Sequence, residues 1–255
     1  MTGITQMLTD PLMQRALLVA LLVGLAAPVI GTYLVQRKLS LLGDGIGHVA
    51  LTGVALGWLV GAALDVVPND ALAVPGAVVA AVAGAVVIEV VRERTRGGGD
   101  VALALLFYGG IAGGVLLIGI AGGTSANLVG YLFGSISTVS TSDVVLTVAL
   151  CALLLGVGLG LRPALFAVSH DAEFARSTGL PVRALNVAIA VVAALTVTVA
   201  MRVVGLLLVS ALMIVPVAVA QLVSRSFAST MHLAMGLGTA VCVVGLAVTY
   251  WVPLA

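Results

Sequence analysis

The chain has 255 residues, of which 62% are hydrophobic and 8% are charged, and its formal net charge is +1. A soluble domain carries about 25% charged residues, so this composition excludes a soluble globular protein and indicates one whose main solvent is lipid. The near-neutral net charge argues against nucleic acid as a partner.

Eight apolar segments are long enough for transmembrane helices, because a bilayer core about 30 Å thick needs about 20 apolar residues per helix. They cover 16–35, 45–64, 71–91, 101–121, 143–161, 182–200, 203–223 and 230–250. Strand-like alternation is absent from them, which argues against a transmembrane β-barrel. We therefore predict an all-α, polytopic membrane protein with about eight transmembrane helices, forming a single domain over 1–255.

Residues 125–143 separate the fourth and fifth spans and are rich in Ser, Gly and Thr. This stretch is too polar for a further span. A half-helix or re-entrant piece buried in the bundle fits it better, because irregular backbone at membrane depth needs protein or water around it.

Lysine and arginine are distributed unequally between the two sides of the predicted membrane domain. If eight spans alternate, one side receives nine of them and the other side two. The nine are Arg37, Lys38, Arg92, Arg94, Arg96, Arg162, Arg176, Arg183 and Arg225, and the two are Arg15 and Arg202. The positive-inside rule then places the loops at 36–44, 92–100, 162–181 and 224–229 in the cytoplasm and the N-terminus outside.

Glycines recur at four-residue spacing in three of the spans. Small residues at this spacing let helix backbones approach closely in a membrane. The triplet Gly53, Gly57 and Gly61 is the strongest case, and the pairs Gly109/Gly113 and Gly156/Gly160 repeat the spacing. We expect these positions to serve helix packing, and they carry no information about a substrate.

Asp44 and His48 stand four residues apart at the start of the second span. In a helix that begins at Gly43 they lie on one face, with Thr52 one turn further. A carboxylate with an imidazole suits borderline divalent cations such as Zn²⁺, Mn²⁺ or Fe²⁺, although a closed structural site needs about four ligands. The alternative is a helix N-terminus at which Asp44 caps the helix and His48 makes a hydrogen bond.

Two other acidic residues near span ends have structural interpretations. Glu89 precedes a run of arginines by one turn, so we expect it to pair with an arginine at the membrane interface. Asp143 follows Ser and Thr at a helix start, which predicts a capping role.

The longest polar segment, Arg162–Arg183, contains its own short helical pattern, HDAEFARSTG. Ser169 is a candidate N-cap, Asp171 and Glu173 fall in the first turn, and Gly179 ends the helix before Pro181. The apolar side of this helix could lie on lipid or dock on a partner, and its single cation, Arg176, favours a partner over anionic lipid. The chain has no GxxxxGK[ST] loop, so it does not bind ATP by that motif.

The stretch RKLSLLGDGIGHVALTGVALG resembles the signature of permease subunits of zinc/manganese/iron ABC importers. Four further stretches agree in order and spacing: DVALALLFYGGIAGGVLLI (100–118), GYLFGSISTVSTSD (130–143), SHDAEFARSTGLPV (169–182) and VVGLLLVSALMIVPVAVAQL (203–222). The resemblance therefore extends over nearly the whole chain.

The resemblance implies a homodimeric permease of the prokaryotic cell membrane that moves zinc, or else manganese or iron, and is not itself an enzyme. Its implied partners are a cytoplasmic ABC ATPase and an extracytoplasmic metal-binding protein, and the metal is cargo and not a resident cofactor. Asp44 and His48 would line the metal path. The segment from Ser169 to Pro181 would be the helix that couples to the ATPase, since Glu173, Ala175 and Gly179 reproduce the spacing of that element.

Three rival functions differ in the residues that they require, and these can be checked in the sequence. A secondary transporter needs coupling-ion carboxylates inside its spans. The predicted spans hold none apart from Glu89, near an end, and Asp44, Asp100 and Asp143 at helix boundaries. An intramembrane zinc protease needs a His-Glu-x-x-His cluster, which the chain lacks. A vitamin-B12 or siderophore-type ABC permease has a related architecture but does not require the Asp44/His48 pair.

Overall fold

The computed structural model describes residues 9–67, 71–94, 99–122, 125–134 and 139–251, in which it contains helices and no strand. The helices are α2 (Pro11–Gln36), α3 (Leu42–Ala63), α4 (Ala73–Arg94), α5 (Gly99–Ile120), α6 (Ser125–Phe133), α7 (Thr141–Gly160), α8 (Arg162–His170), α9 (Ala172–Ser177), α10 (Val182–Val204), α11 (Leu206–Val223) and α12 (Phe227–Trp251). This architecture confirms the predicted all-α class.

Eight helices within the described ranges are long and apolar enough to cross a membrane, namely α2 to α5, α7 and α10 to α12. This agrees with the eight spans predicted from the sequence. Helix α6 is nine residues long and adds no span, which is consistent with the half-helix expected between the fourth and fifth spans. Residues 135–138 of that expected segment lie outside the described residues.

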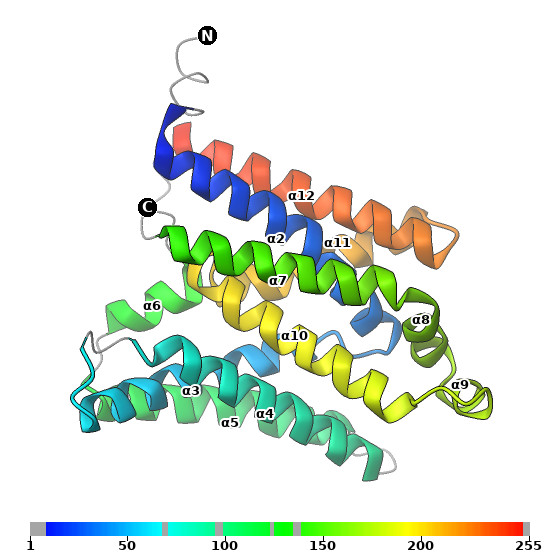
Figure 1. Ribbon diagram of the computed structural model, residues 1–255, viewed down its shortest axis with the longest axis horizontal. Helices are drawn as coiled ribbons and strands as arrows, with labels where there is room; N and C mark the ends of the chain where they lie inside the picture. The colour runs from blue at the N-terminus through cyan, green and yellow to red at the C-terminus, as the bar shows by residue number, and fades with distance from the viewer. Residues whose placement is uncertain (1–8, 68–70, 95–98, 123–124, 135–138, 252–255) are drawn as a thin grey trace.

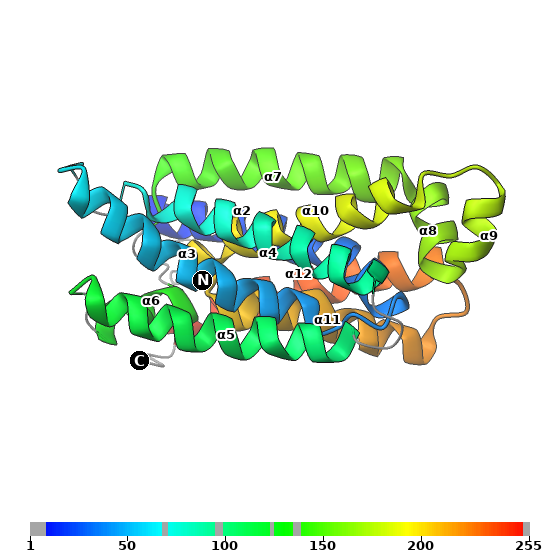
Figure 2. The same cartoon turned by 90° about the horizontal axis from the view of Figure 1, so that it is seen from below.

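The helices form a bundle in which α2 and α10 hold central places (Figure 1). Helix α2 packs against α7, α10, α11 and α12, and α10 packs against α2, α3, α4, α7 and α11. Helix α3 lies between α4 and α5 on one side of the bundle. Helices α8 and α9 and the turn between α11 and α12 share one end, opposite the start of α2 and the end of α12 (Figures 1 and 2). The charge asymmetry predicts that this α8–α9 end faces the cytoplasm.

Glycines bring α3 close to both of its neighbours. A Cβ added to Gly53 would lie 2.6 Å from Ala80 Cβ and 2.9 Å from Ala77 Cα on α4. Gly57 faces the backbone at the start of α4, and Gly61 is buried. Because the α3 and α4 backbones approach this closely, a side chain at Gly53 or Gly57 would force the two helices apart.

The other two glycine pairs do not behave as the spacing predicts. Among the described residues, no heavy atom lies within 4 Å of a Cβ built on Gly109, Gly156 or Gly160. The close approach expected at these three positions is therefore not made to any described part of the chain. On α7 the close contact is made by Gly158, which faces Val29 of α2.

Candidate functional site

Asp44 lies in the first turn of α3 and His48 lies one turn later. Oδ1 of Asp44 is 3.8 Å from Nε2 of His48, and the two side chains are 27% and 10% exposed. The N-cap of α3 is Leu41, and no side chain makes a capping hydrogen bond there. The alternative in which Asp44 caps this helix is therefore wrong.

The pair lies deep in the bundle, because α3 begins inside it. Gly110 of α5 contacts the backbone of His48, and eleven residues at 1.5 Å each place Gly110 about 16 Å along a helix about 32 Å long. Gly47 faces Val197 of α10, which by the same count lies about 22 Å from the first residue of α10. Figures 1 and 2 show α3 starting well away from the α8–α9 end.

Helix α5 determines how the imidazole is held. A Cβ on Gly110 would lie 2.8 Å from the carbonyl carbon of His48 and from the amide nitrogen of Val49. The Phe107 ring meets the His48 ring edge to face at 4.8 Å between centroids. Thr52 Oγ1 donates to the carbonyl oxygen of Gly110 at 2.9 Å and to that of His48 at 3.3 Å. These contacts fix the start of α3 against α5.

The chemistry of the pair is that of a partial cation site. Within the described ranges, no third His, Cys, Asp or Glu joins Asp44 and His48. The His48 nitrogen nearest Asp44 is Nε2, and the other nitrogen, Nδ1, is buried and has no hydrogen-bond partner among the described atoms. One carboxylate and one imidazole can hold a divalent cation transiently, but they are too few to trap it.

The predicted coupling segment forms a projecting structure at the α8–α9 end. Asp171 is the N-cap of α9 and accepts hydrogen bonds from the backbone amides of Glu173 and Phe174, both at 3.0 Å. The side chains of Glu173 and Phe174 are exposed, whereas Ala175 is fully buried. Gly179 follows α9 with φ +82°, a left-handed conformation that favours glycine. An acid and an aromatic ring therefore point away from the bundle.

Two details of this segment differ from the sequence prediction. Ser169 is buried inside α8 and does not cap the short helix, so that expectation is wrong. The chain instead ends α8 at His170 and starts a second helix after Asp171. Pro181 is the residue before α10 and occupies its N-cap position.

Glu89 pairs with arginines, as the sequence predicts, but it takes two of them. Its Oε1 lies 3.0 Å from Arg37 Nη2, and its Oε2 lies 3.1 Å from Arg92 Nη1. The side chains of Arg37 and Glu89 are only 7% and 3% exposed. Burial lowers the pKa of the Arg37 guanidinium from its ordinary value, and the Glu89 carboxylate opposes this effect. The pairing ties the end of α2 to α4.

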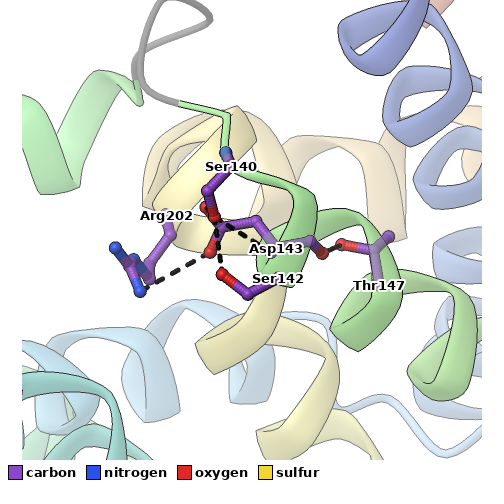
Figure 3. A network of polar contacts seen from close by, with 5 residues as sticks. All are labelled: Ser140, Ser142, Asp143, Thr147 and Arg202. Atoms are coloured by element: carbon purple, nitrogen blue, oxygen red, sulfur yellow. Dashed lines mark hydrogen bonds and ion pairs between the residues drawn. The ribbon is translucent and has the colours of Figure 1, made fainter.

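Asp143 lies in the first turn of α7, which starts at the end of the bundle opposite α8 and α9 (Figure 1). Figure 3 shows its polar contacts. Its Oδ2 accepts hydrogen bonds from the backbone amide and the hydroxyl of Ser140, while its own amide donates to Ser140 Oγ at 3.2 Å. This reciprocal capping confirms the capping role predicted for Asp143. The other carboxylate oxygen lies 3.5 Å from Arg202 Nη1 on α10, an ion pair that the sequence did not indicate. The α7 start is therefore joined to α10.

The eight long apolar helices of the described ranges make the chain a multi-pass membrane protein. The model of the ABC 3 transport family matches residues 9–255. The chain therefore belongs to this family of ABC permease subunits, and it is a transport component of the prokaryotic cell membrane and not an enzyme.

Individual relatives agree with this assignment. The chain is 32% identical over 242 residues to a manganese transport system membrane protein of Halalkalibacterium halodurans, covering 94% of this chain and 80% of the relative. It is 29% identical over 240 residues to a chelated iron transport system membrane protein of Yersinia pestis, covering 94% and 77%. Among solved structures, PsaBC from Streptococcus pneumoniae in complex with Fab is similar with a TM-score of 0.82 and 30% identity, covering 98% of this chain and 86% of the other.

Proposed function

We propose that this chain is the membrane-spanning subunit through which an ABC importer moves a divalent transition metal into the cytoplasm. The observation that carries the proposal is the Asp44–His48 pair, in which Asp44 Oδ1 lies 3.8 Å from Nε2 of a largely buried imidazole about halfway along α5. Charged or polar groups at this depth are expensive and mark substrate pathways. The small number of ligands suits cargo that must leave again.

Manganese is the first candidate, with iron and zinc next. The sequence alone favoured zinc, but one carboxylate without any thiolate suits Mn²⁺ or Fe²⁺ at least as well. The names of the relatives, which specify manganese and chelated iron, support the same order. Further ligands come from other helices or from a second copy of the chain in a homodimer.

Two partners complete the proposed importer. A cytoplasmic ATPase docks on α9, where exposed Glu173 and Phe174 offer one charge and one aromatic ring. A metal-binding protein delivers the cation at the opposite end. ATP-driven closure of the ATPases is then transmitted through α9 as a lever.

Two rivals are less well supported. A secondary transporter would use Glu89 as its coupling carboxylate, but that side chain is occupied by two arginines. A vitamin-B12 or siderophore-type permease would not require the Asp44/His48 pair.

The test uses the chain reconstituted in liposomes with its ATPase and binding protein. Asp44→Ala and His48→Ala should each abolish uptake of radioactive manganese, while expression and assembly stay normal. His232→Ala is the matched control, because His232 is an exposed histidine on α12. Uptake that persists in both site variants would refute the assignment, and competition by zinc and iron in the unaltered complex ranks the three metals.

A further inference from the structure

The position of Asp44 and His48 depends on a very short connection. Residues 38–41 are all that separates the α2 C-cap, Arg37, from the first residue of α3. Lys38 adopts a left-handed conformation with φ +58°, and the Leu39 amide donates to the Leu34 carbonyl oxygen at 2.8 Å. Because the connection is short and turns sharply, a shift of Arg37 is passed on to the start of α3.

Arg37 is held by one carboxylate. Its guanidinium is buried, its Nη2 lies 3.0 Å from Glu89 Oε1, and its Nη1 has no hydrogen-bond partner among the described atoms. A buried ion pair seldom gives more stability than apolar side chains of the same volume, but it fixes the geometry of the groups it joins. In a chain with only 8% charged residues, such a contact indicates that the ion pair holds the residues it joins in position.

We propose that Glu89 is a positioning residue for transport: it fixes Arg37 against α4 and thereby sets the depth and orientation of Asp44 and His48. The inference rests on the proposed function of that pair. Glu89 does not touch the metal; it acts through Arg37 and the connection at residues 38–41. Helix α4 also packs along α3, so the carboxylate and the pair it positions belong to one packed unit.

The same helix offers a matched control. Glu93 lies one turn after Glu89 on α4 and pairs with Arg183 at 3.2 Å, but these side chains are 32% and 69% exposed. An exposed pair of this kind contributes little, and Arg183 lies on α10 and not in the 38–41 connection. Glu93→Gln therefore removes the same charge from the same helix without touching Arg37.

The experiment measures metal uptake and local mobility in the reconstituted complex. A spin label on Leu41→Cys, an exposed position in the connection, reports mobility after Cys151→Ala and Cys242→Ala remove the native thiols. Glu89→Gln should raise the KM for manganese at least fivefold and make the label more mobile, and Glu93→Gln should change neither. Glu89→Asp keeps the charge but shortens the reach, so it should also raise KM; a purely charge-balancing role predicts normal KM in this variant.

Unfolding of a single variant does not end the test. The double variant Arg37→Gln with Glu89→Gln buries no unpaired charge from this pair, so it should fold while keeping the raised KM and the mobile label. An unchanged KM and an unchanged label in folded Glu89→Gln, or equal effects in Glu93→Gln, would overturn the proposal. The mobility of the label is measured independently of transport. If Glu89→Gln makes the label more mobile while Asp44→Ala still takes up manganese, the proposed metal path is wrong, but the role of Glu89 in fixing Arg37 is supported.

Discussion

Gly110 packs against the backbone that carries His48, and its replacement should disturb metal transport without removing any ligand. In Gly110→Ala the new Cβ would lie 2.8 Å from the His48 carbonyl carbon and the Val49 amide nitrogen, against a normal separation of about 3.5–4.0 Å. Helix α3 must therefore move by roughly 1 Å, the difference between those separations. Overpacking of this kind costs about 1–3 kcal/mol. If this whole overpacking cost appears as a loss of metal-binding free energy, metal affinity falls between about fivefold and about 150-fold, at 1.4 kcal/mol per tenfold.

The neighbouring glycine is the control for this substitution. A Cβ on Gly109 meets no described heavy atom within 4 Å, and alanine in a helix is favoured over glycine by about 1 kcal/mol. Gly109→Ala should therefore transport like the unaltered chain, while Gly110→Ala should show a raised KM for manganese in reconstituted liposomes. Equal uptake by both variants would refute the argument that α5 holds His48 in place.

Three further substitutions test the packing and the segment at the α8–α9 end. Gly53→Ala forces α3 away from α4 and should lower the stability of the purified protein by about 1–3 kcal/mol, measured as a lower Tm. The control is Gly119→Ala, whose new side chain meets no described neighbour and should leave the Tm unchanged. Asp143→Ala removes the carboxylate half of the reciprocal cap and the Arg202 contact and should cost about 0.5–2 kcal/mol; an unchanged Tm would show that these carboxylate contacts contribute nothing. Gly179→Ala places a side chain at φ +82°, a strain of about 1–2 kcal/mol, and should loosen α9 so that metal no longer stimulates ATP hydrolysis. Normal metal-stimulated hydrolysis in that variant would contradict docking at α9.

The spans were predictable because their signal is local. A run of about 20 apolar residues is sufficient for a helix that crosses lipid, so the eight helices appear near their predicted positions. The depth of Asp44 was not predictable, because α3 begins inside the bundle, and hydropathy cannot distinguish a helix that starts at the interface from one that starts within the protein. Arg37 looked like an interfacial residue for the same reason, although it is buried against Glu89.

Contacts between helices were predicted less well than the helices themselves. Helix α5 is apolar on all sides, so the doublet Gly109–Gly110 does not reveal which glycine faces α3. In the coupling segment, Ser169 and Asp171 are both able to cap a helix. The choice depends on where α8 ends, and the burial of Leu165 and Val168 extends α8 past Ser169. Which glycine faces α3 and which residue caps α9 both depend on packing between segments that are distant in the sequence.

The start of α3 inside the bundle has an electrical consequence for any cation bound there. The first turn of a helix carries roughly half a positive elementary charge from its unpaired amides, and Asp44 lies in that turn. The carboxylate is partly neutralised by its own helix, so a cation beside it experiences a weaker attraction than a free carboxylate would exert. A metal bound as proposed at Asp44 and His48 would therefore be held loosely, and its exit would require only a small change in the surrounding helices.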